Sequence, residues 1–230
     1  MTSPGPGLED LAVILPVLNA GERLAQTLIT LPAVGEVIVV DGGSVDDTVA
    51  RAAAHGARVL HSVPGRGQQL ALGADASTSA WLLFLHADTR LDASAWAALA
   101  NHIAAPQRQA CAGAFRFRLD DAAWQARLLE WGVGLRVALL ALPYGDQGLL
   151  IHRDLYAEVG GFAALPLMED VDLARRLGRH RLRRLDGAAV TSAERWRRRG
   201  WVRQSALNLR CLALYFLGVA PARIATLYGR

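Results

Sequence analysis

The stretch "EVIVVDGGSVDDT" (Glu36–Thr48) decides the fold class of this chain. A run of apolar residues stops at Asp41, two glycines follow, and further carboxylates come before the next apolar position. Continuous apolar runs of this length are typical of strands that are buried on both faces of a parallel sheet. The acidic residues after Gly43 favour the start of a helix, where negative charge is stabilised. The segment therefore predicts a buried strand, a tight turn and a helix.

Similar units lie on both sides of this stretch. We expect further strands at Leu11–Val17, Ala57–Val63 and Ala80–Asp88, with amphipathic helices between them. This alternation predicts an α/β fold with a Rossmann-like, mostly parallel sheet flanked by helices. Ligands of such sheets bind beyond the carboxyl ends of the strands. The residues expected along that rim are Pro16, Leu18, Asn19, Asp41, Gly43, Arg66, His86 and Asp88.

The second half of the chain is less regular. Alternating residues at Cys111–Asp120 predict a strand on a mixed edge of the sheet, and Ala122–Leu140 predicts a long helix. Further strands are expected within residues 145–153 and 182–192, with a helix over residues 168–180 between them. The tail from Gly200 is expected to be mainly helical. We find no internal repeat and no linker, which favours one domain.

Composition narrows the chemistry. The chain has 230 residues, and all 25 of its basic residues are arginines. The absence of lysine excludes a P-loop lysine and Schiff-base catalysis, whereas arginine suits phosphate. The apolar runs are too short to span a membrane and the N-terminus lacks a signal-peptide pattern, so we expect a cytoplasmic protein. No element predicts nucleic-acid binding.

Five motifs occur in a recognisable order: "ILPVLNAGERL", "VIVVDGGSVDDT", "GRGQQLALGADAS", "WLLFLHADT" and "GGFAALPLMEDVDLARRL". Together they resemble the family 2 glycosyltransferases of the GT-A fold, over roughly residues 11–177. The forms "HADT" and "PLMEDVDL" are most similar to a small bacterial subgroup. The resemblance implies one glycosyltransferase domain over residues 1–230. Within it, residues 11–119 would bind a nucleotide sugar, residues 120–199 would bind the acceptor, and residues 200–230 would form a helical tail.

The resemblance implies a nucleotide-sugar donor, with a UDP-sugar as the expected one. Asp41 would accept the N–H of the base, and Arg66 would lie near the phosphates. His86-Ala87-Asp88 stands where the family carries its Asp-x-Asp metal motif. Asp88 would bind Mg²⁺ or Mn²⁺, and His86 would reach the ribose. A helix-capping role for Asp41, a solvated turn for Arg66 and an ordinary surface turn at Asp88 remain the alternatives.

The resemblance also implies an inverting reaction with Asp170 as general base and Glu169 beside it in the catalytic centre. The alternative is an ordinary acidic first turn of a helix. Acceptor or phosphate contacts are expected from Asp146, Gln147, Arg195 and Trp196. Arg195 and Trp196 match part of a Gln-x-x-Arg-Trp motif of processive synthases, but Ser192 replaces the glutamine, so processivity is not supported.

Two other activities stay open: a nucleotide-sugar-binding pseudoenzyme, favoured by His86, and a sugar-phosphate nucleotidyltransferase, disfavoured by the missing lysines. The acceptor and the oligomeric state are not predicted. Arginines and tryptophans precede the apolar segment Leu207–Leu217, which suits contact with the inner face of a membrane and a lipid-linked acceptor. The alternative is that this segment packs onto the sheet as core.

Overall fold

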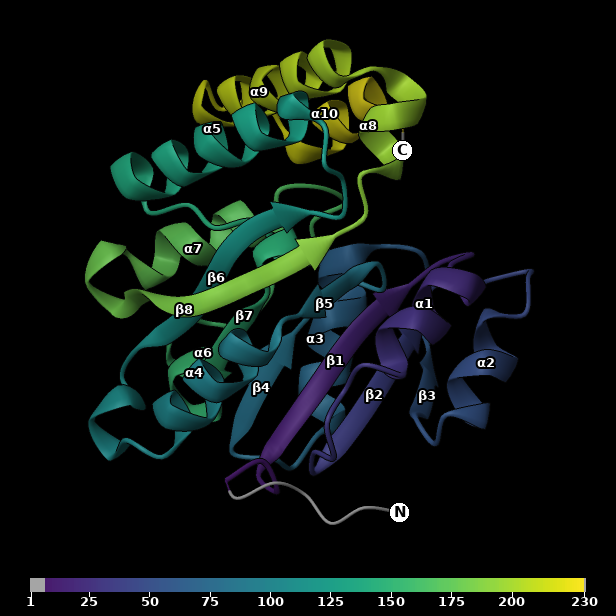
Figure 1. Ribbon diagram of the computed structural model, residues 1–230, viewed down its shortest axis with the longest axis vertical. Helices are drawn as coiled ribbons and strands as arrows, with labels where there is room; N and C mark the ends of the chain where they lie inside the picture. Colours follow the sequence, from purple (N-terminus) through teal and green to yellow (C-terminus); the bar gives the residue numbers. More distant parts are fainter. Residues whose placement is uncertain (1–6, 230) are drawn as a thin grey trace.

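The computed structural model describes residues 7–229. Residues 1–6, part of the stretch on which the expectation of no signal peptide rests, lie outside the described residues. The chain forms one eight-stranded sheet in the order β3-β2-β1-β4-β7-β6-β8-β5, with helices on both faces (Figure 1). The strands are β1 (Leu11–Val17), β2 (Glu36–Asp41), β3 (Arg58–His61), β4 (Trp81–Phe84), β5 (Thr89–Leu91), β6 (Ala112–Leu119), β7 (Leu149–His152) and β8 (Leu182–Thr191).

The helices are α1 (Gly21–Leu28), α2 (Thr48–Ala54), α3 (Arg66–Ala76), α4 (Ala93–Ile103), α5 (Trp124–Leu140), α6 (Arg153–Glu158), α7 (Glu169–Leu177), α8 (Glu194–Arg199), α9 (Trp201–Phe216) and α10 (Pro221–Tyr228). Short 3₁₀ turns occur at η1 (Pro106–Arg108), η2 (Gly145–Gln147) and η3 (Arg179–Arg181). The long helix and the helical tail expected from the sequence are both present.

The sheet is mostly parallel, as predicted. Strands β3, β2, β1 and β4 are parallel neighbours, and β6 and β8 are parallel. Strand β7 runs antiparallel to β4 and β6, and β5 runs antiparallel to β8. The expectation that Cys111–Asp120 forms an edge strand is wrong, because β6 lies between β7 and β8. The strand expected at Ala80–Asp88 ends at Phe84, so residues 85–88 leave the sheet as a loop. Strand β5 and helix α4 were not expected.

Alternation along the buried strands divides the core into two layers. Val13 and Val39 point to the layer covered by α1, α2 and α4, whereas Ile14 and Ile38 point to the layer covered by α3, α6 and α7. Helix α3 approaches the sheet closely at Gly73, where a Cβ atom would lie 2.5 Å from the Ile14 side chain. Two-sided burial explains why these strands are continuously apolar.

The C-terminal tail packs on α7, and Trp201 at the start of α9 also packs against the cluster that contains Phe117 and Leu119 of β6. Cys211 and Leu212 of α9 and Ile224 of α10 form an apolar cluster with Val171 and Ala174. The opposite side of α9 remains exposed, so the segment expected either as core or as a membrane contact is half docked. Among the described residues, no helix is long and apolar enough to cross a membrane.

Candidate active site

The loops after β1 and β2 are tied together at the carboxyl end of the sheet. The backbone N–H of Asn19 donates to Ser44 Oγ at 2.8 Å, and Asn19 Oδ1 accepts the N–H of Val45 at 2.9 Å. Asn19 has a φ of 49°, a left-handed conformation that asparagine tolerates better than most residues. The backbone N–H and the side-chain oxygen of Asn19 therefore hold the two loops together.

The carboxylate of Asp41 shapes the turn that follows it. It accepts the N–H groups of Gly43 and Ser44, each at 3.0 Å, and the Ser44 hydroxyl. Gly43 has a φ of +94°, which favours glycine. Only 2% of Asp41 is exposed, so a base could reach only the lone pairs that these bonds leave free.

Two adjoining cavities lie at this edge of the sheet. The larger, of about 710 Å³, extends from Pro16 and Leu18 across to Pro166 and α10. The smaller, of about 90 Å³, lies between the β4–β5 loop, η2, the start of α7 and α9. Four side chains line both cavities: Arg66, His86, Asp88 and Arg195. A ligand in the larger cavity would therefore meet the polar groups of the smaller one, whereas Asp41, Asn19 and Gly43 line neither.

Asp88 is fixed where the β4 loop meets the end of β8. Its carbonyl accepts the N–H of Ser192 at 3.1 Å, and the Thr191 hydroxyl lies 3.4 Å from its Oδ1. The Thr191 hydroxyl also accepts a hydrogen bond from the hydroxyl of Thr89, the first residue of β5. The short strand β5, absent from our expectations, therefore anchors the loop that carries His86 and Asp88.

Helix α7 begins inside the site. Met168, the residue before it, has a φ of 69°, a strained backbone conformation that is concentrated at functional sites. Glu169 is 1% exposed, and its Oε1 lies 3.3 Å from Arg66 Nη1 on α3. Burial opposes the charge of Arg66, but the carboxylates of Glu169 and Asp170 outweigh it and raise the pKa of Arg66. The structure thus joins two predicted site residues in one buried ion pair.

Asp170 lies beside His86, with η2 between them. Asp170 Oδ2 accepts the N–H of Gly145 at 2.9 Å, and Oδ1 accepts the N–H of Val171 at 2.7 Å. A Cβ atom on Gly145 would lie 2.5 Å from His86 Nε2, so a larger residue there would displace the His86 ring. Asp170 also lines the smaller cavity, where an acceptor hydroxyl could reach it.

Asp146 and Gln147 face different cavities although they are neighbours in sequence. Asp146 lines the smaller cavity, and its buried Oδ1 has no hydrogen-bond partner among the described residues. Burial raises the pKa of Asp146 to about 6; Arg136 opposes this effect and Asp170 adds to it. Gln147 bonds instead to the Phe115 carbonyl at 2.9 Å, which turns its side chain away from the site.

The residues present offer a partial cation site. The described residues contain no group of three or more His, Cys, Asp or Glu side chains arranged to hold a metal. Asp88 and the unpartnered oxygen of Asp146 nevertheless line the same cavity. Mg²⁺ and Mn²⁺ prefer oxygen ligands, and Mg²⁺ is usually bound through one or two carboxylates plus substrate phosphates. This donor set therefore fits a cation whose coordination a diphosphate completes.

The C-terminal tail closes the site from the side opposite the sheet, which the sequence did not predict. Arg195 Nη1 donates to Tyr228 Oη at 3.3 Å. Trp196 packs with its ring centroid 6.1 Å from that of Phe117 and lines the smaller cavity. Tail residues that line the cavities are Asn208, Cys211, Ala222, Ala225, Tyr228 and Gly229. The described part of the tail, residues 200–229, thus contributes directly to the site.

Two further residues of the site were not among the predicted site residues. Gln69 is buried on α3 and donates to the carbonyls of Val17 and Val40, at 2.8 and 2.7 Å, which fixes the ends of β1 and β2. Tyr144 lines the smaller cavity beneath the Arg136 guanidinium, which lies 3.4 Å from the ring centroid. Their roles depend on contacts between distant segments.

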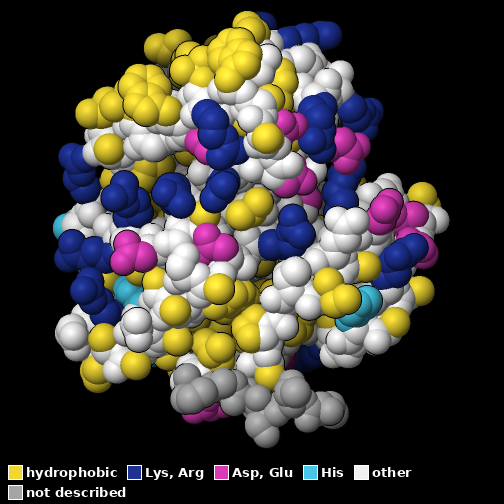
Figure 2. Space-filling model, viewed as in Figure 1, with side chains coloured by type: hydrophobic (Ala, Val, Ile, Leu, Met, Phe, Trp, Pro, Cys, Tyr) yellow, Lys and Arg dark blue, Asp and Glu magenta, His cyan; other side chains and the backbone are white. Residues whose placement is uncertain are grey.

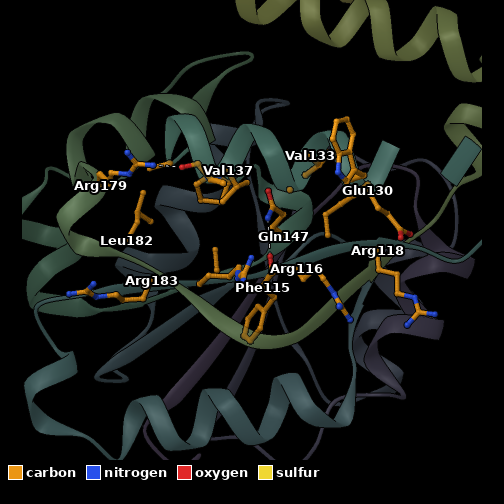
Figure 3. Close-up of a pocket in the computed structure, with 18 of the residues that line it drawn as sticks. Phe115, Arg116, Arg118, Glu130, Val133, Val137, Gln147, Arg179, Leu182 and Arg183 are labelled. Carbon is orange, nitrogen blue, oxygen red and sulfur yellow. Dashed lines mark hydrogen bonds between the residues drawn. The ribbon is translucent and has the colours of Figure 1, made fainter. Parts of the chain in front are cut away.

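A separate cavity of about 580 Å³ lies between α5 and the β6–β8 part of the sheet (Figure 3). Val133 and Val137 enter it from α5, and Arg116 and Arg183 lie on the strands below. The η2 turn separates it from the smaller cavity, because Gln147 lines one and Asp146 the other. This cavity therefore does not include the acidic cluster.

The fold and the position of the acidic cluster define an α/β protein with a ligand site beyond the carboxyl ends of its strands, and comparison with known proteins identifies its family. The chain belongs to glycosyl transferase family 2, whose model matches residues 12–165. An uncharacterized glycosyltransferase of Mycobacterium tuberculosis is 39% identical over 84 residues, which cover 36% of this chain. The match spans 38% of that relative, and the same holds for a Mycobacterium bovis glycosyltransferase.

Solved structures show the GT-A glycosyltransferase fold. Glucosyl-3-phosphoglycerate synthase from Mycobacterium tuberculosis, solved with Mn²⁺, UDP-glucose and phosphoglyceric acid, matches with a TM-score of 0.55 and 21% identity. The match covers 76% of this chain and 69% of that one. S. aureus TarS matches with a TM-score of 0.62 and 15% identity, over 79% of this chain and 36% of that one. The expected GT-A fold is confirmed.

Proposed function

We propose that this protein transfers a sugar from a nucleotide-diphosphate donor, with a UDP-sugar favoured, to an acceptor hydroxyl with inversion. The observation that carries the proposal is the pair of adjoining cavities that share Arg66, His86, Asp88 and Arg195. The larger would hold the nucleotide and the smaller the reacting sugar. The domain division proposed from the sequence fits this arrangement, with residues 11–119 and 120–199 meeting at the shared side chains.

In this proposal Asp170 is the general base. It accepts the proton as the acceptor oxygen attacks the anomeric carbon and the bond from that carbon to the diphosphate oxygen breaks. Its hydrogen bonds to the N–H groups of Gly145 and Val171 orient the carboxylate. Glu169 is a positioning residue, because a nearly inaccessible carboxylate paired with Arg66 cannot meet an acceptor.

The diphosphate would lie against Arg66 and Arg195, whose charges stabilise the leaving group. Asp88 would hold Mg²⁺ or Mn²⁺, which supplies further stabilisation of the charge developing on the diphosphate. Crystals of the related synthase contain Mn²⁺ with UDP-glucose, which supports this assignment. His86 would direct the ribose or sugar. Asp41 lines neither cavity, so it would act on the donor indirectly, by holding the turn whose Ser44 supports the loop beside Leu18 and Ala20.

Calorimetry with UDP, with and without Mn²⁺, tests donor binding, and release of UDP from UDP-glucose tests the chemistry. The proposal requires both UDP binding and turnover that depends on Asp170. Binding without turnover under any acceptor condition would favour the nucleotide-sugar-binding pseudoenzyme. Formation of a nucleotide sugar from UTP and a sugar phosphate would favour the nucleotidyltransferase instead.

A further inference from the structure

Helix α5 carries large apolar side chains on its outer face. Trp124, Leu128, Trp131, Leu135 and Leu139 are between 44% and 70% exposed. Their spacing of four, three, four and four residues places them in one stripe along the helix. Of the whole helix, only Ala126 is fully buried. The stripe is thus continuous over the length of α5.

The opposite side of α5 is apolar as well. Leu129 and Val133 pack against the cluster that contains Phe117 and Trp196. A helix with two opposite apolar faces is normally covered on both of them, because exposed apolar surface is costly in water. Isolated exposed leucines are common in proteins, whereas a contiguous apolar patch marks an interaction surface. The outer stripe therefore requires a partner.

Helix α9 extends the same surface. Val202, Leu209 and Phe216 recur every seven residues on its outer side and are 83%, 68% and 49% exposed. Helices α5 and α9 lie at the same end of the molecule (Figure 1), and apolar side chains gather there as a cap (Figure 2). We call the outer faces of α5 and α9, with these eight residues, the apolar cap.

Arginines border the apolar cap. Residues 195–230 contain eight arginines and no acidic residue. Arg203 and Arg210 are exposed beside the outer stripe of α9, and the Arg175 guanidinium lies 5.3 Å from the Phe216 ring centroid. Figure 2 shows dark-blue side chains below the cap. A second copy of the chain would bring like charges together, whereas an anionic lipid surface would neutralise them.

We propose that the apolar cap lies in the interfacial layer of an anionic bilayer, with α5 and α9 roughly parallel to the membrane. A helix of 17 residues is about 25 Å long, and tryptophan and arginine are well suited to the headgroup layer. This surface includes α5, for which no membrane role was expected from the sequence. Membrane binding through this surface does not depend on glycosyl transfer.

The arrangement has a consequence that does rest on the proposed function. Asn208 and Cys211 on the inner side of α9 line the smaller cavity, whereas Leu209 lies on the outer side. The cavity would then lie about 10 Å below the membrane surface, one helix diameter. An acceptor hydroxyl carried by a lipid headgroup would need to descend only that far.

Vesicle flotation tests the proposal with the full chain, using phosphatidylcholine vesicles with and without phosphatidylglycerol. The test variant is Leu128→Glu combined with Leu135→Glu, and the control is Ile29→Glu, which changes a residue 76% exposed at the end of α1. We expect the wild type and the control to bind anionic vesicles, and the double variant to bind at least about 10-fold more weakly. Tryptophan emission should shift to the blue on binding.

Equal binding by the double variant and the wild type would overturn the assignment of α5, and so would no binding at low salt. Because both leucines are exposed, all variants should keep the wild-type melting temperature, which a thermal scan checks. Sedimentation equilibrium tests the alternative that a second copy of the chain covers the apolar cap. A wild-type dimer that the double variant dissociates, together with no vesicle binding, would identify the cap as a contact between copies and refute the membrane proposal.

Discussion

Arg66 on α3 and Glu169 on α7 form an ion pair, Nη1 to Oε1 3.3 Å, at the boundary of the two cavities, and their side chains are 19% and 1% exposed. The pair connects the nucleotide-side loop to the start of the helix that carries Asp170. A buried charge that loses its partner is strongly destabilising, even where the pair itself contributes little.

We therefore expect Glu169→Leu to lower the free energy of unfolding by about 3 kcal/mol, because Arg66 keeps its charge without its nearest partner. Adding Arg66→Met should restore part of the loss. Urea denaturation of the single and double variants gives the coupling. Glu158→Gln, which removes an exposed pair with Arg181 at 2.6 Å, should cost less than about 1 kcal/mol. A similar loss of stability in Glu169→Leu and Glu158→Gln would contradict the prediction that Glu169 neutralises a buried arginine.

The general-base proposal predicts that Asp170→Asn lowers turnover by about 10²–10⁴-fold while UDP binding stays near the wild-type value. Asparagine can still accept the N–H of Gly145, so the fold should be preserved. Asp172→Asn is the matched control, because Asp172 lies on the same helix but pairs with Arg176 at 2.6 Å. Donor turnover and calorimetry measure the two effects. Unchanged turnover in Asp170→Asn would rule out the assignment.

The sequence placed Asp41 at the end of a buried strand and Asp170 at the start of a helix because apolar runs with clear ends locate strands and helices, whereas Asp88 lies in the loop after its expected strand. It could not place Gln147, which turns into a different cavity from its neighbour Asp146. Nor could it pair Arg66 with Glu169 or bring Tyr228 over the site. Such contacts depend on how distant segments pack, which no local pattern encodes.

The exposed stripe of α5 shows a second limit. Leu128 and Leu129 are adjacent leucines that the sequence does not distinguish. Leu128 is 57% exposed, whereas Leu129 packs against the core. The apolar spacing predicted the helix with nearly correct ends, but two opposite apolar faces do not show which of them points to the core. Only the position of β6 and α8 shows which side remains uncovered.

Calorimetry with UDP distinguishes the proposed roles of Asp88 and Asp41 in donor binding. Asp88→Ala should remove the part of UDP affinity that depends on Mn²⁺, because a hard oxygen ligand is lost. Asp41→Asn should weaken UDP binding with and without Mn²⁺. The N–H groups of Gly43 and Ser44 would lose one of the two carboxylate oxygens that accept them, which loosens the turn. If Asp88→Ala kept the full response to Mn²⁺, another residue would be the ligand. An unaltered metal-free affinity in Asp41→Asn would show that this turn does not support the donor site.

The stability of the metal-free protein should depend on Asp146 in a direction set by its pKa. Burial raises this pKa to about 6 from 3.8, so the folded state holds the proton more tightly than the unfolded chain. The wild type therefore loses stability as the pH rises from about 4 through 6, and the loss is complete above that range. Asp146→Asn cannot ionise and should escape this loss.

In EDTA, Asp146→Asn should thus be more stable than the wild type at pH 8 by about 1–3 kcal/mol, with a smaller difference at pH 4.5. Asp92→Asn is the control of opposite sign. Burial would raise the pKa of Asp92, but bonds from Ser94, Ala95 and Ala188 outweigh it and lower that pKa. That variant should be less stable than the wild type at pH 8 and approach it in acid. Urea denaturation at both pH values measures each difference. A pH-independent difference for Asp146→Asn would mean that Asp146 is not buried as a protonated acid.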